Sequence, residues 1–179
     1  MGDTHGSIFT IGHSDHPPGT LLQLLVRTGI EVLVDVRSNP SSRWVPHANP
    51  HDLRRILKPA GIQYIYMGDA LGGRPESLEN DVQESAKVKY EAIRKTQAFQ
   101  RGLERLLGSL MKHRTCVMCA EEDPSECHRN LLVGEGLRLM GIRALHIRGS
   151  GAVQTDEELR KEKLGVPSNQ LELPFGDMT

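Results

Sequence analysis

Short apolar runs alternate along the chain with longer segments in which apolar residues recur every three or four positions. The short runs are rich in β-branched residues and predict strands over 7–11, 31–37, 62–67, 115–119 and 143–147. The longer patterns predict helices over 20–27, 52–58, 90–111, 127–140 and 155–163. Such alternation is typical of parallel strands joined by crossover helices. We therefore expect a single α/β domain with a mostly parallel, open sheet of about five strands and helices on both faces.

The remaining segments divide the chain. Residues 1–150 carry the predicted α/β domain, and residues 151–179 are expected to form a C-terminal helix and a flexible tail. The segment 38–50 is rich in Ser, Asn and Pro, and a loop of this length inside a compact domain tends to be functional. The polar segment 76–84 has no clear periodicity and is expected to be a loop.

Composition narrows the class of protein. With 22 basic and 23 acidic residues the net charge is −1, so any contact with nucleic acid must come from a local cluster of cations. Three cysteines in a chain of 179 residues argue against a disulfide framework and for a reducing compartment. No run of 18 apolar residues occurs, and the first residues lack a signal-peptide pattern. We expect a cytoplasmic protein with no membrane partner.

Polar, cationic and nucleophilic residues follow the predicted strands. In an open parallel sheet, ligands bind beyond the carboxyl ends of the strands. The residues expected there are, in chain order, His13, Ser14, Arg37, Arg43, Trp44, Gly73, Arg74, Cys119, Glu121, Cys127, His128 and Arg129. The sequence therefore predicts a site at this edge of the sheet.

The segment from Cys119 to Arg129 holds the densest chemistry. Asp123-Pro-Ser125 predicts a turn that caps the following helix. Cys127, His128 and Arg129 would then lie in the first helical turn, where free N–H groups favour an anion and lower the pKa of a thiol. The alternative is a buried structural cysteine beside a capped helix. We favour a functional segment because three ionisable residue types meet in one loop.

Two familiar cysteine sites are disfavoured. Cys116, Cys119, Cys127 and His128 offer the donors of a zinc site, but Cys116 and Cys119 would face opposite sides of a strand. We therefore expect no metal and no cofactor. A phosphatase-type thiolate loop requires an arginine six residues after the cysteine, and Arg129 stands ten residues after Cys119 and two after Cys127.

Asp35 and Trp44 add two further expectations. Asp35 interrupts an apolar strand, and a buried carboxylate is either paired with an arginine or used in catalysis. We predict Asp35, Cys119 and Glu121 as catalytic residues, because carboxylates beside arginines suit acid–base chemistry on an anionic substrate. Trp44 either stacks a base or pins its loop to the core.

Several motifs together resemble a known family. They are Thr10-Ile-Gly-His-Ser14, Asp35-Val-Arg37, Ser42-Arg43, Leu71-Gly-Gly73, Met118-Cys-Ala-Glu121 and Cys127-His-Arg129. This pattern resembles the domain of unknown function 488 family over about residues 7–148. The resemblance implies that these clustered residues are the family signature, and it implies no particular activity.

The tail carries a second resemblance. Gln170-Leu-Glu-Leu-Pro-Phe175 is similar to the peptide by which bacterial replication and repair proteins bind the polymerase sliding clamp. In that motif Gln170 would fix the orientation while Leu171, Leu173 and Phe175 enter an apolar groove. The alternative is that these apolar residues fold back on the domain. A sliding clamp is thus an expected partner.

Three functional hypotheses follow. The first is an enzyme of DNA repair or modification that acts on DNA or a nucleotide base, for example by hydrolysis of the N-glycosidic bond, with a rim of arginines for phosphates. The second is a thiol enzyme for sulfur transfer or redox chemistry that uses Cys119 and Cys127. The third is a non-catalytic module that binds a nucleotide or a phosphate. We favour the first.

Overall fold

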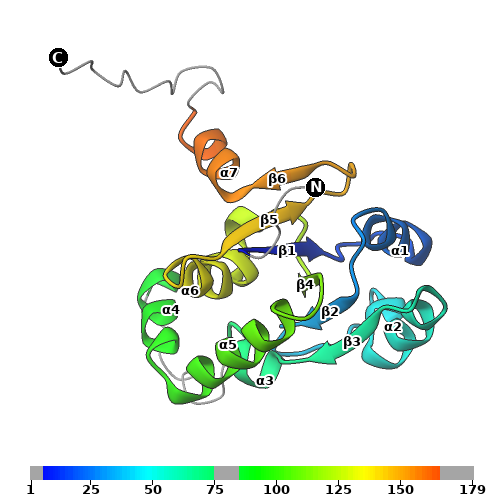
Figure 1. Cartoon of the computed structure of the whole chain (residues 1–179), viewed down its shortest axis with the longest axis horizontal. Coiled ribbons are helices and arrows are strands. Elements are labelled where there is room, and N and C mark those ends of the chain that lie inside the picture. The colour runs from blue at the N-terminus through cyan, green and yellow to red at the C-terminus, as the bar shows by residue number, and fades with distance from the viewer. Residues whose placement is uncertain (1–5, 75–84, 166–179) are drawn as a thin grey trace.

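The computed structural model describes residues 6–74 and 85–165 (Figure 1). Its centre is a sheet of six strands in the order β3-β2-β4-β1-β5-β6. The strands are β1 (Ser7–Gly12), β2 (Val32–Asp35), β3 (Gln63–Tyr66), β4 (Thr115–Cys119), β5 (Arg143–Ile147) and β6 (Val153–Thr155). All neighbours pair in parallel except β5 and β6. The predicted α/β class and mostly parallel sheet are confirmed.

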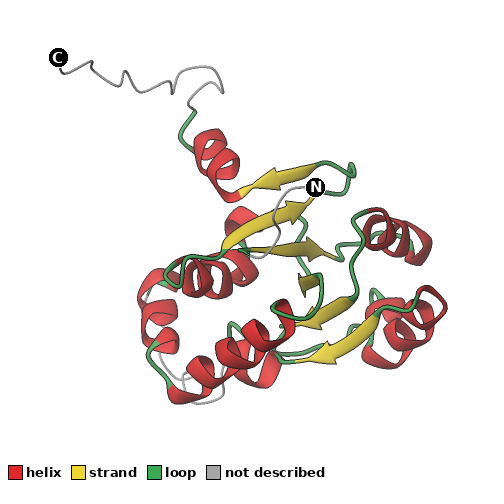
Figure 2. Ribbon diagram, in the orientation of Figure 1, coloured by secondary structure: helices red, strands yellow, loops and turns green. Residues whose placement is uncertain are grey.

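Helices cover both faces of the sheet (Figure 2). They are α1 (Pro18–Arg27), α2 (Pro50–Leu57), α3 (Gly68–Leu71), α4 (Ala86–Arg94), α5 (Gln97–Leu110), α6 (Glu135–Arg138) and α7 (Asp156–Lys163). The apolar sides of α1 and α2 pack on one face with Phe9, Leu33 and Met118. Those of α4, α5 and α6 pack on the other face with Ile8, Val34 and Val117. Alternate strand residues thus enter two separate cores.

The helical segments differ from the predicted ones in two places. The predicted helix 90–111 is two helices, because the Thr96 hydroxyl accepts a hydrogen bond from Phe99 N–H and caps a new helix there. The predicted helix 127–140 is a π-helix (Arg129–Gly134) that continues into α6. A short 3₁₀ turn (Pro124–Glu126) precedes it. None of the helices within the described residues has the length and apolar character needed to span a bilayer.

The connections create a switch point beside the predicted site. The chain leaves β1, passes over β4 and enters β2, whereas it leaves β4, passes over β1 and enters β5. The first connection contains α1 on one face, and the second contains Leu132 and Leu137 on the other face. The loops after β1 and β4 therefore start side by side and continue into connections on opposite faces of the sheet, which is the place where ligands bind in such sheets.

Candidate functional site

The loop after β4 runs directly beside the loop after β1. His13 N–H donates to the Cys119 carbonyl (2.9 Å), and Ser14 N–H donates to the Ala120 carbonyl (2.7 Å). A Cβ atom at Gly12 would lie 1.8 Å from the Glu121 carbonyl oxygen, so only glycine allows this close passage. Ser14 itself has a φ of 45°, a conformation uncommon for a residue with a side chain. This approach fixes where Glu121 leaves the sheet.

Four ionisable side chains converge in this loop. The Cys119 and Cys127 thiols both donate to Glu121 Oε2, at 3.0 and 3.1 Å. Cys119 Sγ also lies 3.4 Å from Nδ1 of His128. Cys119 and Cys127 are buried, whereas Glu121 is exposed. We call Cys119, Glu121, Cys127 and His128 the thiol cluster. Its two cysteines are buried, and Glu121 reaches solvent.

The cluster shifts the pKa of each of its members. Burial would raise the pKa of Glu121, but the two thiol hydrogen bonds outweigh it and lower this pKa to about 2. A hydrogen bond from Cys119 lowers the pKa of Cys127 against the effect of burial, and the same bond together with burial raises the pKa of Cys119. Burial lowers the pKa of His128, but its hydrogen bond and charge interaction with Cys127 outweigh burial and raise this pKa.

The third cysteine belongs to the core. Cys116 is fully buried and packs with Leu33 and Met118 on the opposite face of the sheet from the cluster. Burial raises the pKa of its thiol. The predicted opposite orientation of Cys116 and Cys119 is therefore confirmed.

The His128 ring is held in one orientation. Its Nε2 lies 2.9 Å from the carbonyl oxygen of Val36. Because a carbonyl only accepts, Nε2 carries the proton, and in the neutral ring Nδ1 has a free lone pair toward the sulfur atoms. A Cβ atom at Gly73 would lie 2.9 Å from the His128 side chain, so Gly73 provides the space that this ring occupies. Gly73 therefore positions this ring, and its contact with a substrate stays a prediction.

Arg129 and Arg148 fix the turn that carries Glu121. The Arg129 guanidinium is buried and donates to the carbonyl oxygens of Glu121 and Glu122, the latter at 2.6 Å. On the outer side, Arg148 donates to both carboxylate oxygens of Glu122, at 3.0 and 2.8 Å. Arg148 lowers the pKa of Glu122 by this pairing. Arg129 therefore orients the cluster, and its guanidinium group is already used inside the protein.

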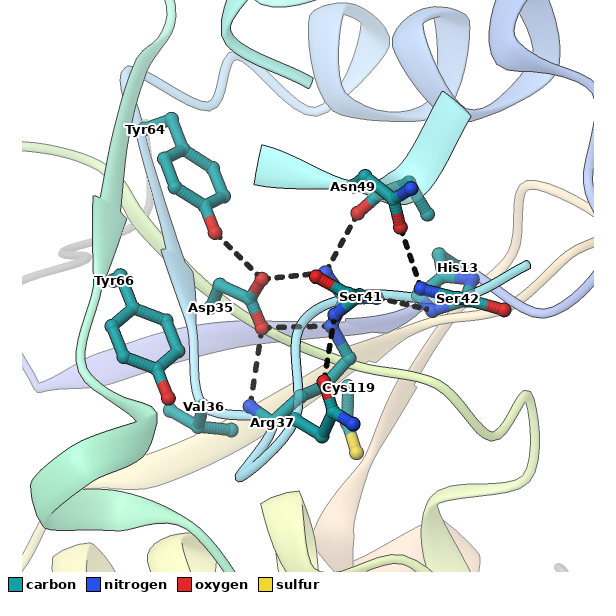
Figure 3. A network of polar contacts seen from close by, with 12 residues as sticks. His13, Asp35, Val36, Arg37, Ser41, Ser42, Asn49, Tyr64, Tyr66 and Cys119 are labelled. Atoms are coloured by element: carbon teal, nitrogen blue, oxygen red, sulfur yellow. Dashed lines mark hydrogen bonds and ion pairs between the residues drawn. The ribbon is translucent and has the colours of Figure 1, made fainter. Parts of the chain in front are cut away.

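Asp35 lies in a second, buried network (Figure 3). Arg37 donates to both of its carboxylate oxygens, through Nε at 2.9 Å and Nη2 at 2.6 Å. Tyr64 donates its hydroxyl to the same carboxylate at 2.7 Å. Arg37 also lies 2.9 Å from His13 Nε2 and donates to the Ala48 carbonyl. Asp35 is fully buried, so its contacts favour a positioning role, and the predicted catalytic role stays a prediction.

The loop after β2 presents an exposed aromatic residue beside a cation. Ser42 N–H donates to the side chain of Asn49 at 2.6 Å, and Ser42 Oγ accepts from Trp44 N–H, which shapes the loop tip. Trp44 is 81% exposed, and the Arg43 guanidinium lies 4.7 Å from the centre of its ring. Trp44 therefore does not pin the loop to the core. Arg43 and Arg74 are the predicted rim arginines that face solvent.

Tyr90 was not predicted, and it lies beside the cluster. Burial and the negative charges of Cys127, Cys119 and Glu121 raise the pKa of Tyr90. It also lines a groove of about 590 Å³ between α4, the π-helix and α7, together with Ser125 and Leu131. No sequence motif marks Tyr90, because its place in the site comes from the packing of α4 against the π-helix.

The structure brings most of the predicted site residues to one edge. The loops after β1, β2 and β4 are directly connected through His13, Arg37 and Cys119, and Gly73 joins them through His128. Gln170, Leu171, Leu173 and Phe175 of the clamp-like peptide lie outside the described residues.

Comparison with known proteins places this site in a family. No curated protein and no solved structure matches the chain. One family model, described as Domain of unknown function DUF488, matches residues 19–135. The match contains the whole thiol cluster as well as Asp35, Arg37 and Gly73, whereas His13 and Ser14 precede it. The chain therefore belongs to the DUF488 family.

Proposed function

We propose that this protein is a hydrolase that breaks a carbon–nitrogen bond of a nucleotide base, free or within DNA, with Glu121 as its general acid–base. The observation that carries the proposal is the position of Glu121. Of the acidic side chains at this edge, Asp35 is enclosed by Arg37 and Tyr64, and Glu122 is held by Arg148. Glu121 instead has an exposed carboxylate, and this carboxylate accepts hydrogen bonds from the two thiols of the cluster.

The chemistry suits an exposed carboxylate whose pKa is lowered, because such a group is ionised at neutral pH and can accept a proton. A water molecule would donate a proton to Glu121 as its oxygen attacks the carbon of the C–N bond, and the departing nitrogen would then take up that proton. The target bond is either the N-glycosidic bond or the bond to an exocyclic amine of the base. Both reactions need the base to lie outside a stacked duplex.

Two features support a base as substrate. Trp44 presents an exposed ring, and stacking on such a ring contributes about 1–3 kcal/mol per base. The groove lined by Tyr90 and Ser125, at about 590 Å³, has the size of a small-molecule site and adjoins the turn between Glu121 and Cys127, although no residue of the thiol cluster lines it. Arg43 and Arg74 remain for phosphate contacts, because Arg37 and Arg129 are engaged inside the protein.

The test is a panel of free nucleosides, nucleotides and single- and double-stranded DNA with modified, damaged or mismatched bases. Mass spectrometry of the products distinguishes a released base from a base that has exchanged an amine for oxygen. We expect Glu121→Gln to lower the rate at least ~100-fold, since acid–base groups contribute about 10²–10⁴. Glu126→Gln, a nearby exposed glutamate, serves as the matched control and should leave the rate unchanged.

Trp44→Ala should raise KM roughly tenfold with little change in kcat, and Trp44→Phe should restore most of the affinity. If no panel member changes, or if the Glu121→Gln variant is as active as the parent, the hydrolase proposal fails. Binding without turnover on the whole panel would instead favour a nucleotide-binding module.

A second candidate is a thiol-dependent transfer or redox enzyme. It is favoured by the meeting of Cys119 and Cys127 at one carboxylate oxygen. Iodoacetamide labelling at neutral pH, followed by mass mapping, tests it. Labelling of neither residue in the native protein would rule this candidate out, with the buried Cys116 as the internal control.

A further inference from the structure

The thiol cluster has the donor set and the spacing of a metal site. One ligand atom from each of Cys119, Glu121, Cys127 and His128 lies within 4.8 Å of every other. The measured approaches are 3.0 and 3.1 Å from Glu121 Oε2 to the sulfurs and 3.4 Å from His128 Nδ1 to Cys119 Sγ. Four donors around a zinc ion, each bonded at about 2.0–2.3 Å, stand at comparable separations from one another.

The imidazole is prepared as a ligand. In metal sites, the non-ligating nitrogen of a histidine commonly donates its proton to a carbonyl or carboxylate, which fixes the tautomer. Here Nε2 of His128 contacts the Val36 carbonyl at 2.9 Å, and Nδ1 faces the sulfurs. Gly73 leaves room for the ring, because a Cβ atom at this position would lie 2.9 Å from the His128 side chain.

The backbone that carries the donors is also fixed. Cys119 ends a central strand, and Arg129 holds the carbonyl groups of Glu121 and Glu122. Asp123 accepts from Ser125 N–H at 2.8 Å and shapes the turn before Cys127. The donors therefore converge through backbone contacts, independently of their hydrogen bonds to one another.

The local charge calls for a cation. Two buried thiols meet at one oxygen atom of a carboxylate. Arg129 donates to backbone carbonyls, and Arg37 is paired with Asp35. A divalent ion would balance the thiolates that such a site requires.

We propose that Cys119, Cys127 and His128 bind one Zn²⁺ ion, with the exposed Glu121 at the fourth, exchangeable position. Thiolate and imidazole donors select zinc over magnesium or calcium, which prefer oxygen ligands. Binding replaces the two thiol protons with two Zn–S bonds and releases both protons to solvent. The site differs from the set considered from the sequence, because Glu121 takes the place of Cys116.

This inference deepens the proposed function, and its catalytic meaning rests on that function. Cys119, Cys127 and His128 would hold the ion, the ion would supply activation of a water molecule, and Glu121 would move the proton once it had left the ion. Zinc enzymes that deaminate nucleobases also hold the ion with histidine and cysteine ligands, but their proton-moving glutamate is not a zinc ligand. Zinc binding itself can be measured without any substrate.

The test uses the full chain, reduced and freed of metal with a chelator. Zn²⁺ alone is titrated and its content is measured by mass spectrometry, and we expect one ion per chain. Co²⁺ alone then serves as a spectroscopic probe, which should give tetrahedral visible bands and a thiolate charge-transfer band with the intensity of two sulfurs.

Variants assign the ligands. Cys127→Ser and His128→Ala should each weaken Zn²⁺ binding more than 100-fold, and Glu121→Gln should weaken it roughly tenfold. Cys116→Ala is the matched thiol control and should keep both the stoichiometry and the two-sulfur Co²⁺ band. Circular dichroism checks that each variant folds. If Cys127→Ser unfolds, the Co²⁺ spectrum of the parent chain still decides whether two thiolates bind the metal.

The outcomes separate the two proposals. Stoichiometric zinc in a chain that turns over no panel member would leave the metal site standing and overturn the hydrolase. Turnover that persists after complete chelation would overturn the metal site as the reaction centre. Binding of less than one zinc, a Co²⁺ spectrum without thiolate bands, or loss of binding in Cys116→Ala would overturn the metal site altogether.

Discussion

At the scale of single residues, close contacts decide how the site is built. Gly12 shows this most clearly, because the Glu121 carbonyl occupies the place where a side chain would begin. The Asp35 network also depends on a few individual contacts, because Arg37 and Tyr64 both donate hydrogen bonds to the Asp35 carboxylate. Both positions therefore give sharp predictions for single substitutions.

Gly12→Ala should destabilise the fold by roughly 1–3 kcal/mol, because the added methyl group meets backbone that cannot move aside freely. The displaced Glu121 would also weaken the thiol cluster. Urea unfolding measures the first effect. Gly108→Ala is the matched control: it lies in α5 with open space around it and should stabilise by about 0.5–1 kcal/mol. Equal stabilities for the Gly12→Ala variant and the parent would contradict the close approach.

Asp35→Asn should cost about 3–5 kcal/mol, because it leaves the Arg37 guanidinium buried without its counter-ion. Tyr64→Phe removes one hydrogen bond to the same carboxylate and should cost only about 1 kcal/mol. Chemical denaturation of both variants tests this order. A reversed order would show that Tyr64, and not the ion pair, holds the network together.

At this scale the sequence was informative where chemistry is local. The pairing of Asp35 with an arginine follows from the cost of burying a lone carboxylate, and Arg37 two residues later is the partner. The opposite orientation of Cys116 and Cys119 follows from the alternation of side chains along a strand. Tyr90 was missed because its contacts depend on a helix more than 25 residues away in sequence from Cys119.

At the scale of elements, the boundary between α4 and α5 is set by a capping side chain. Apolar periodicity continues through residues 90–111, yet Thr96 ends one helix and starts the next. Thr96 donates to the Ile93 carbonyl at 2.8 Å and accepts from Phe99 N–H at 3.2 Å. A capping side chain therefore overrides a continuous apolar pattern.

Thr96→Ala should lower the free energy of unfolding by about 1 kcal/mol through loss of this cap, and Thr96→Ser should retain most of it. Thermal and urea unfolding of the pair provide the measurement. If the alanine and serine variants unfold together with the parent chain, α5 does not depend on its cap.

The π-helix from Arg129 to Gly134 could not be deduced from periodicity, since its apolar residues also fit an α-helix. The wider turn accompanies a buried Arg129 that reaches the 121–122 carbonyls. Such helices are rare and often occur at functional sites. The sixth strand was missed for another reason: β6 has three residues and no apolar alternation.

At the scale of the whole molecule, the α/β domain continues beyond residue 150: β6 adds a strand to the sheet and α7 packs beside it. β6 pairs antiparallel with β5, and α7 buries Leu159 against the domain. Asp156 at the start of α7 joins them to β5: it lies 3.9 Å from His146 and 2.9 Å from Arg160. His146 and Arg160 lower the pKa of Asp156 against the effect of burial.

Asp156→Asn should therefore lower the free energy of unfolding by about 0.5–1 kcal/mol at neutral pH, as expected for loss of a carboxylate at a helix N-terminus. Because the pKa is lowered in the folded state, this stabilisation is present above the unfolded pKa and disappears as the pH falls through the folded pKa. Urea unfolding at pH 7 and at about pH 2 measures this stabilisation where it is present and where it is lost.

Glu157→Gln is the control for this prediction, since Glu157 is exposed and pairs only with Lys161 among the described contacts. At pH 7, Glu157→Gln should lower the free energy of unfolding by less than Asp156→Asn does. A cost for Asp156→Asn that persists undiminished at low pH would show that hydrogen-bond geometry, and not charge, is responsible.

The sequence by itself determined the local part of this protein: the alternating strands and helices, the two-sided burial of the sheet and the candidate residues after each strand. These follow from side-chain periodicity and from the rule that ligands meet the carboxyl ends of parallel strands. Tertiary structure alone decided the strand order, which places β1 beside β4, and the convergence of Glu121 with Cys119, Cys127 and His128. That convergence depends on contacts between residues far apart in the chain, such as the close approach of Gly12 to the Glu121 carbonyl and the contact of the His128 ring with the Val36 carbonyl. No local pattern encodes such contacts, because they arise only once both cores have packed.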